Sequence, residues 1–203
     1  MKLLVLACKW RQCKSSRTLA LPSDWSLAEL HEALQCAFGW EEEHLYSFTA
    51  PDGTTWSMQM DDDFLDDFGG EADRDPAKTA LSEVFPHAKA RLDYEYDFGD
   101  SNEVSIAFQK AIEGDGPACL EAAGLMAVED SASFGYADGI ANILRKGPGA
   151  RFYRDLADWL DLESPEDAEA WIAGQTADAE KITAELARIR PAKKKRANPR
   201  RKP

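Results

Sequence analysis

The sequence predicts an α+β fold: a mixed, at least partly antiparallel sheet packed by an early helix and followed by a C-terminal helical region. Strand patterns come first, then one helix, then further strands, and only then a run of helices, which is typical of α+β folds. Residues 91–98 alternate apolar and charged side chains, which is typical of an antiparallel strand with one buried and one solvent-exposed face. The apolar set of this strand is Leu92, Tyr94, Tyr96 and Phe98.

Two strands and one helix account for the first forty residues. Residues 2–8 predict an apolar strand and residues 17–21 a second strand. The helix is expected to begin after Ser26, because Ser26 and Glu29 have the spacing of a capping box. Gly39 is the expected residue at its C-terminal cap.

A hairpin and a second pair of strands follow the helix. Residues 44–50 and 54–60 flank Pro51-Asp52-Gly53, in which proline fixes φ and glycine accepts a positive φ. Residues 61–75 hold eight acids and one arginine, and they predict a solvated loop without the spacing of an EF-hand. The strand at 91–98 then turns into a partner strand.

After a glycine-rich loop the chain is expected to become helical. Apolar side chains recur at helical spacing over residues 136–144, 152–160 and 179–189. Ser164-Pro165 marks the start of a further helix, because proline at the first helical position loses no hydrogen bond.

The predicted organisation is an α+β domain over residues 1–145, C-terminal helices over 146–190 that pack on or extend it, and a basic disordered tail over 191–203. The 203 residues carry a formal net charge of −13. The tail holds seven Lys or Arg and no acid, which leaves 17 basic and 37 acidic residues over 1–190, a net charge of −20. Such a body repels nucleic-acid phosphate, so DNA or RNA contact is expected only through residues 191–203 or a local basic spot.

The compartment is predicted from the cysteines and from the apolar runs. Four cysteines without a C-x-x-C pair predict free thiols in a reducing compartment. The apolar run over residues 3–7 is shorter than the apolar core of a signal peptide, and no segment approaches the ~18 continuous apolar residues of a membrane span. We therefore expect a cytoplasmic protein without membrane contact.

Two histidines flank the end of the first helix. His31 borders its apolar face, and His44 stands where the chain turns back into a strand. Either both are structural and bind backbone groups, or the fold brings them to acidic groups as metal ligands or as an acid–base group. The acidic candidates are Asp97, Asp100, Glu129 and Asp130. Spacing along the chain shows no ligand pair, and neither a cofactor nor a bound metal is expected.

Three blocks of residues carry a family resemblance. The first has the pattern L-H-x-x-x-Q-x-x-F-G-W followed by H-L and F, the second is Tyr96–Ser101, and the third combines Glu129-Asp130 with Gly135-Tyr136. The first block comprises Leu30, His31, Gln35, Phe38, Gly39, Trp40, His44, Leu45 and Phe48. With these blocks the chain resembles the plasmid pRiA ORF-three-like family, some members of which are labelled as TnpR-like passenger proteins of an insertion element. The resemblance implies an α+β fold over roughly residues 1–145 and assigns no reaction.

The chain also departs from the pattern of that family. A Pro-Pro-x-Trp-Arg-Arg entry to the second strand is reduced here to Arg17. The family typically continues the second block with Trp and Glu-His, where this chain has Asn102, Glu103 and Val104. Residues 126–128 are Met-Ala-Val in place of Cys-Pro-Pro. A site that relatives build from these positions would be incomplete in this chain.

We interpret the chain as a non-enzymatic cytoplasmic binding or interaction module with a protein partner still to be identified, and the resemblance adds an association with mobile elements. No nucleophile–base set or phosphate loop is recognisable. The alternative is a metal- or acid–base-dependent enzyme that uses His31, His44 and the turn from Asp97 to Asp100. A further alternative is a nucleic-acid accessory factor that acts through residues 191–203.

Overall fold

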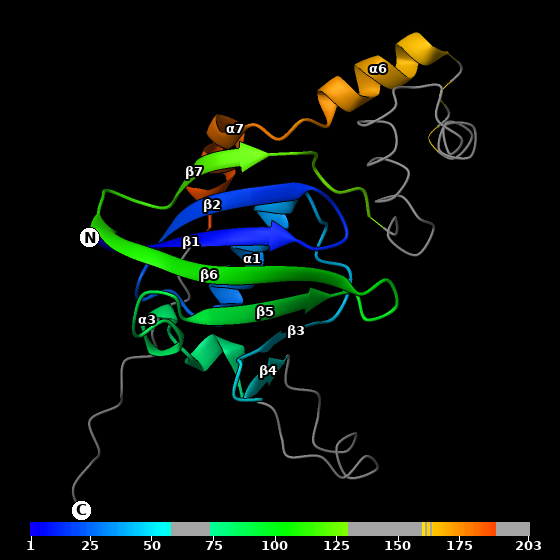
Figure 1. Cartoon of the computed structure of the whole chain (residues 1–203). Coiled ribbons are helices and arrows are strands. Elements are labelled where there is room, and N and C mark those ends of the chain that lie inside the picture. The colour runs from blue at the N-terminus through cyan, green and yellow to red at the C-terminus, as the bar shows by residue number, and fades with distance from the viewer. Residues whose placement is uncertain (58–73, 130–159, 161, 163, 190–203) are drawn as a thin grey trace, which may run out of the picture.

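The structure, a computed structural model, describes residues 1–57, 74–129, 160, 162 and 164–189. Its centre is a seven-stranded sheet with the order β4-β3-β5-β6-β1-β2-β7, and every pairing between these strands is antiparallel. The strands are β1 (Lys2–Trp10), β2 (Ser15–Pro22), β3 (Tyr46–Thr49), β4 (Thr55–Ser57), β5 (Arg91–Tyr96), β6 (Asn102–Glu113) and β7 (Ala118–Ala123). The helices are α1 (Leu27–Phe38), the 3₁₀ turn η1 (Pro76–Lys78), α3 (Leu81–Val84), α6 (Pro165–Gly174) and α7 (Ala179–Leu186). The predicted α+β fold is confirmed (Figure 1).

Helix α1 begins and ends where its sequence predicts. The Ser26 side chain accepts the backbone N–H of Glu29, and the Glu29 carboxylate accepts the backbone N–H of Ser26. At the other end Gly39 adopts a φ of 91° and donates its N–H to the Gln35 carbonyl. A Cβ at Gly39 would lie 3.1 Å from Met126 Cε, so both the backbone angle and the neighbouring segment favour glycine here.

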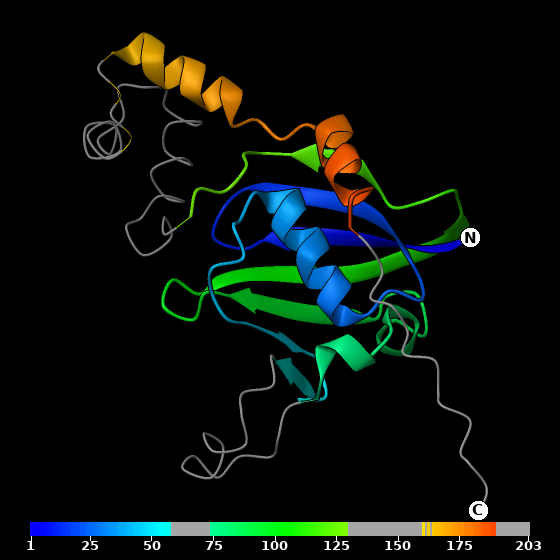
Figure 2. The same cartoon turned by 180° about the vertical axis from the view of Figure 1, so that it is seen from behind.

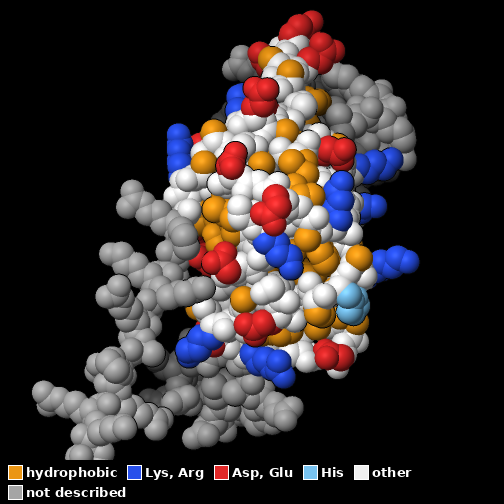
Figure 3. Space-filling model, turned by 90° about the vertical axis from the view of Figure 1, so that its left-hand side faces the viewer, with side chains coloured by type: hydrophobic (Ala, Val, Ile, Leu, Met, Phe, Trp, Pro, Cys, Tyr) orange, Lys and Arg blue, Asp and Glu red, His pale blue; other side chains and the backbone are white. Residues whose placement is uncertain are grey.

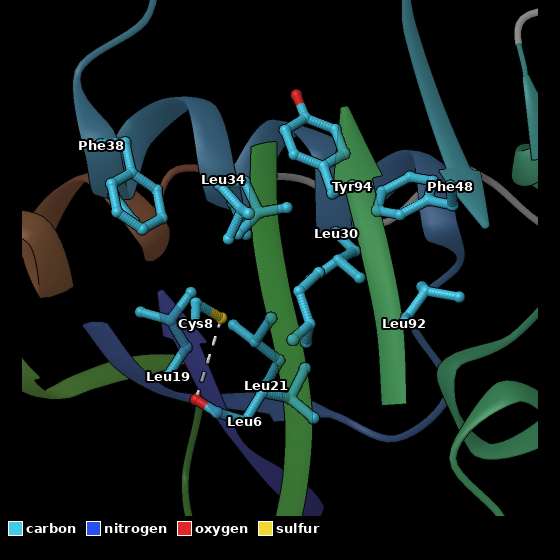
Figure 4. Packing of buried hydrophobic residues seen from close by; sticks show 14 of the residues in the cluster. Leu6, Cys8, Leu19, Leu21, Leu30, Leu34, Phe38, Phe48, Leu92 and Tyr94 are labelled. Atoms are coloured by element: carbon cyan, nitrogen blue, oxygen red, sulfur yellow. Dashed lines mark hydrogen bonds between the residues drawn. The ribbon is translucent and has the colours of Figure 1, made fainter. Parts of the chain in front are cut away.

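One face of the sheet carries the main core, and helices α1 and α7 cover that face (Figure 2). Leu30, Leu34 and Phe38 of α1 are fully buried, because their spacing places them on one side of the helix. Figure 4 shows these side chains packed among residues of the sheet. Those sheet residues include Leu6, Cys8, Leu19, Leu21, Phe48, Leu92 and Tyr94.

The C-terminal helix α7 packs on the edge of the sheet beside α1. Ile182 and Leu186 are buried in the main core. The Thr183 hydroxyl accepts the backbone N–H of Cys119 in β7 at 2.9 Å and donates to the Ala179 carbonyl at 2.8 Å. This helix therefore extends the core, while the predicted boundaries at 145 and 190 stay a prediction.

Two expectations about the strands are wrong. The glycine-rich loop that we expected before the helices contains strand β7, which pairs with β2 from Ser16↔Ala123 to Ala20↔Ala118. Phe98 does not continue the apolar face of β5: the strand ends at Tyr96, and Phe98 is 50% exposed in the turn. The cause is Asp97, whose φ of 58° breaks the alternation of an extended strand.

Several expectations fall outside the described residues. They are the helices at 136–144 and 152–160, most of the acidic loop 61–75, the basic tail 191–203 and the site candidate Asp130. None of the helices that the structure describes is both long enough and apolar enough to span a membrane.

Candidate functional site

The end of helix α1 places the first sequence block beside Glu129, the one residue of the third block that the structure describes. The backbone N–H of Glu41 donates to Glu129 Oε2 at 2.8 Å, although 88 residues separate the two. The N–H of Ala127 donates to the Phe38 carbonyl at 2.6 Å. The segment after Gly39 therefore runs along residues 127–129.

The turn after β5 brings the second block to the same place. Asp97 has a left-handed backbone, which Asp and Asn tolerate better than most residues. Its N–H donates to the Leu45 carbonyl at 2.9 Å, and its own carbonyl accepts the N–H of Ser101 at 2.6 Å. Asp97 Oδ1 accepts the N–H of Gly99 at 3.0 Å. These bonds hold the Asp97 carboxylate next to His44.

His44 lies between two carboxylates. Its Nδ1 is 3.9 Å from Asp97 Oδ1, and its Nε2 is 3.6 Å from Glu129 Oε1. The His44 side chain is 31% exposed, whereas those of Asp97 and Glu129 are 12% and 11% exposed. Water and salt screen such charges less than they screen surface charges. We call the group of His44, Asp97, Glu129 and the adjoining Tyr96 the histidine corner.

Tyr96 supports the histidine corner from the core side. Its ring centroid lies 5.7 Å from that of His44 and 5.3 Å from that of Trp40. The Tyr96 hydroxyl accepts the backbone N–H of Glu43 at 3.1 Å. Burial raises the pKa of Tyr96, and the negative charge of Glu129 raises it further. A side-chain hydrogen bond with Glu129 acts in the same direction, so the phenol stays protonated at neutral pH.

Two acceptor oxygens in the same turn and strand have no hydrogen-bond donor among the described residues. They are Oδ2 of Asp100 and Oδ1 of Asn102. The strand register pairs Asn102 with Tyr96, and Asn102 is only 4% exposed. A buried polar group without a partner costs about 1–3 kcal/mol. A ligand that supplies donors here would remove that cost.

His31 belongs to the core rather than to the histidine corner. Its ring stacks on Tyr46 with centroids 3.7 Å apart, and its Nδ1 lies 2.8 Å from the Tyr94 hydroxyl. That hydroxyl accepts from Gln35 Nε2 at 2.9 Å, and Gln35 Oε1 accepts the N–H of Glu42. With the amide oriented in this way, the Tyr94 proton points to His31 Nδ1, which acts as acceptor in a neutral imidazole.

The structure thus places one sequence candidate, His31, in the core and the other described candidates at or near the histidine corner. It brings together His44, Asp97 and Glu129, and Asp100 lies on the same turn. The ring of Tyr96 is a neighbour of both histidines, with its centroid 6.3 Å from that of His31 and 5.7 Å from that of His44.

The geometry of the histidine corner does not suit a metal ion. Asp97 and Glu129 face different nitrogens of one imidazole, so an ion bound to either nitrogen would meet only one of these carboxylates. Across the described ranges, no three His, Cys, Asp or Glu side chains are placed to hold a metal. The absence of a cofactor stays a prediction.

The buried His31 should make stability depend on pH in a defined window. Desolvation lowers the pKa of His31 to about 4 in the folded protein, from an ordinary value near 6.5. The unfolded chain therefore binds a proton below about pH 6.5 that the folded protein does not bind until about pH 4. Above pH 6.5 His31 is neutral in both states, and its full contribution to stability is present. As pH falls below 6.5 the free energy of unfolding decreases, by about 2–3 kcal/mol at pH 4.5.

Urea unfolding of wild type and His31→Asn at pH 7 and pH 4.5 measures this effect. At pH 7 the variant should be less stable by about 1–3 kcal/mol, since the bond to Tyr94 is poorly replaced. The gap should shrink by about 2–3 kcal/mol at pH 4.5, because only wild type takes up the extra proton on unfolding. The exposed His87→Asn serves as control. A gap that is constant with pH would show that His31 is not held neutral.

Arg17 is a buried residue whose importance the sequence only hinted at, by retaining it in an otherwise altered motif. It is 1% exposed, and its guanidinium lies 4.9 Å above the Phe38 ring. Burial lowers the pKa of Arg17 to about 10, so it stays charged at neutral pH. The bond to the Ala37 carbonyl places this charge at the negative end of the α1 dipole. The guanidinium donates to the carbonyls of Ser16, Ala37, Ala123 and Leu125.

Comparison with known proteins gives a family and a fold. A family model described as plasmid pRiA4b ORF-3-like protein matches residues 6–170. The uncharacterized protein y4hQ of Sinorhizobium fredii (strain NBRC 101917 / NGR234) is 33% identical over 118 residues, which cover 56% of this chain and 57% of that protein. The chain thus aligns with little more than half of this curated relative.

A solved structure has the same fold. The crystal structure of the protein of unknown function MM3350 from Methanosarcina mazei Go1 matches with a TM-score of 0.65 and 22% identity, covering 88% of this chain and 96% of that one. At this level of identity the match shows a shared fold and nothing about activity.

Proposed function

The chain belongs to the plasmid pRiA4b ORF-3-like family, and from this premise we propose that it is a non-enzymatic binding module whose histidine corner holds a cationic side chain of a protein partner. The observation that carries the proposal is the pair of buried acceptor oxygens without donors, on Asp100 and Asn102. They lie in the turn and strand that supply Asp97 to the corner. A donor group bound there gains hydrogen bonds that the protein alone does not make.

Charge supports a cation as the ligand. The histidine corner contains the largely buried carboxylates of Asp97 and Glu129, and Asp100 adds a third carboxylate to the turn. A guanidinium presents five donors in a planar fork that matches carboxylates, and it carries its charge at any physiological pH. An arginine side chain of a partner therefore fits this set of acceptors better than a neutral or anionic group does.

Two finer parts of the proposal concern where the module works. We place it in the cytoplasm, which four free cysteines support, since oxidising compartments favour disulfides. An association with mobile elements is supported by the description of the family, which refers to a plasmid reading frame. Contact with nucleic acid is assigned by charge to residues 191–203, and a binding constant that falls steeply with salt would test that assignment.

Backbone NMR of the full chain tests the proposed site. N-acetylarginine amide should shift the amide signals of residues 41–45 and 97–102 in a saturable titration, because these segments carry the corner. N-acetylglutamate amide, the probe of opposite charge, should leave the same signals in place. Shifts that are spread over the whole acidic surface, or that the two probes cause equally, would contradict the proposal.

A second candidate function is acid–base catalysis, and the position of His44 between Asp97 and Glu129 is the observation that favours it. A carboxylate on one side of an imidazole can orient it to move a proton on the other side. A panel of activated esters and phosphate esters provides the test. Turnover that falls by about a hundredfold or more in His44→Gln would favour this candidate, since general acid–base catalysis has effects of that size.

A further inference from the structure

A second concave surface lies at the opposite ends of β3 and β5 from the histidine corner. It is a groove of about 520 Å³ between the β3–β4 turn and residues 83–91. Trp56 lines it and is only 4% exposed, with Nε1 donating to Thr79 Oγ1 at 3.0 Å. Its apolar lining is formed by Ala50, Pro51, Val84, Pro86 and Ala90.

Three cationic side chains line this groove: one lies shortly before η1, and two lie where the chain enters β5. Arg74, Lys89 and Arg91 are exposed, and none of them forms an ion pair with a carboxylate of the described residues. The Arg74 guanidinium lies 5.9 Å from the Trp56 ring centroid. The backbone N–H of Lys89 donates to the Phe108 carbonyl at 2.9 Å, which fixes the loop that carries it.

The two acidic residues that line the groove accept hydrogen bonds from nearby backbone N–H groups of the protein itself. Asp52 accepts the N–H of Thr54 at 2.9 Å, and this bond lowers the pKa of Asp52. Glu83 accepts the N–H of Ala80 at 3.4 Å at the start of α3. Both carboxylates are therefore engaged locally, and the charge of Arg74 also acts on Asp52. Lys89 and Arg91 form no ion pair with a carboxylate in the described part of the chain. Figure 3 shows Lys and Arg side chains among acidic ones on one side of the molecule, so this face carries charges of both signs.

We propose that this groove binds a short acidic segment of a protein partner, whose carboxylates pair with Arg74, Lys89 and Arg91. The apolar lining suits the aliphatic stems of the peptide's side chains, and the cations suit their carboxylates. This site is independent of the histidine corner, which takes a ligand of opposite charge.

A nucleic acid fits the same groove less well. Single strands are bound on exposed aromatic faces, and the ring of Trp56 is buried. A strand also extends well beyond a groove of this size, over a protein of net charge −13 that repels its phosphates. A short acidic peptide places its charges within the groove alone.

Fluorescence anisotropy with a labelled hexaglutamate peptide and the full chain tests the proposal. Affinity should fall by about tenfold in the variant Arg74→Gln/Lys89→Gln/Arg91→Gln, which removes three exposed ion pairs. The control Lys9→Gln/Lys14→Gln/Lys110→Gln changes the net charge equally with exposed residues outside the groove, and its affinity should stay within about twofold. Binding should weaken as salt is raised.

Three results would overturn the proposal. An equal loss of affinity in both triple variants would mean that the peptide responds to net charge alone. Binding that survives in the groove variant and vanishes when residues 191–203 are removed would assign the peptide to the basic tail. Tighter binding of an oligothymidylate than of hexaglutamate, lost in the groove variant, would make the groove a nucleic-acid site.

Discussion

Replacing Arg17 by methionine should lower the free energy of unfolding by about 3–5 kcal/mol. Methionine keeps most of the volume and can still pack on Phe38, but it removes the donors to the carbonyls of Ala37, Ala123 and Leu125. Of these carbonyls, only that of Leu125 keeps another side-chain donor among the described residues, the Ser15 hydroxyl. Those carbonyls belong to the end of α1, to β7 and to the segment after it, so one side chain connects three parts of the fold. Removing one member of a buried charged network has effects of this size.

Arg11→Met is the matched control for Arg17→Met. Arg11 directly follows β1, whose hairpin partner β2 carries Arg17. The Arg11 side chain is 46% exposed and pairs with Asp93 and Glu103. Surface ion pairs contribute about 0–1 kcal/mol, so this variant should unfold close to wild type. Urea unfolding of both variants decides the question. Similar losses of unfolding free energy in both variants would mean that Arg17 acts through its positive charge alone rather than through its buried hydrogen bonds.

Replacing Trp40 by alanine should cost about 3–5 kcal/mol, the range for a large aromatic residue removed from a core. Trp40 is 6% exposed, and its ring centroid lies 5.3 Å from that of Trp10, 5.2 Å from Phe38 and 5.3 Å from Tyr96. It therefore packs the end of α1 against β1 and β5. Much of this cost would come from the cavity that remains, since the surrounding rings cannot collapse fully.

Phe98→Ala provides the comparison for Trp40→Ala, because Phe98 is 50% exposed in the turn beside the histidine corner. This variant should stay within about 0.5 kcal/mol of wild type. Thermal or urea unfolding measures both. Near-neutral stability of Trp40→Ala, combined with loss of ligand binding, would instead make Trp40 a contact residue of the site.

The sequence predicted the elements whose signals are local. The capping box of Ser26 and Glu29 and the glycine at position 39 set the ends of α1 through bonds within a few residues. Strand β7 was missed because Ala118–Ala123 has no apolar alternation of its own. This strand forms because it pairs with β2 and bonds to the Thr183 side chain of α7, and both contacts join distant parts of the chain.

The sequence named His44, Asp97 and Glu129 of the histidine corner as candidates, but not Tyr96, and it did not show that His31 lies apart from them. His31 and His44 stand near one helix end, but helical register turns His31 into the core, where Tyr46 and Tyr94 surround it. Glu129 reaches His44 through a bond to the backbone of Glu41 that no spacing in the sequence reveals. The groove cations escaped notice for the same reason, since only the fold brings their segments together.

Asn102 lies next to the histidine corner and departs from the pattern that the family resemblance implies. The family resemblance expects tryptophan at this position and histidine at Val104. Val104 is fully buried and apolar, whereas Asn102 presents an acceptor oxygen without a donor. This difference is consistent with a ligand that offers hydrogen-bond donors, and it leaves the corner with one histidine rather than a set of them.

The affinity of N-acetylarginine amide for charge-neutral variants of the histidine corner tests the central claim most directly. Asp97→Asn keeps a residue that tolerates the left-handed backbone, and Glu129→Gln keeps an acceptor for the Glu41 N–H. Each change removes one negative charge, and Asp115→Asn, exposed and outside the corner, removes the same charge as a control. The account predicts about tenfold weaker binding in either corner variant, unchanged binding in the control, and melting temperatures within about two degrees of wild type. Unchanged affinity in both corner variants, or the same loss in the control, would contradict it.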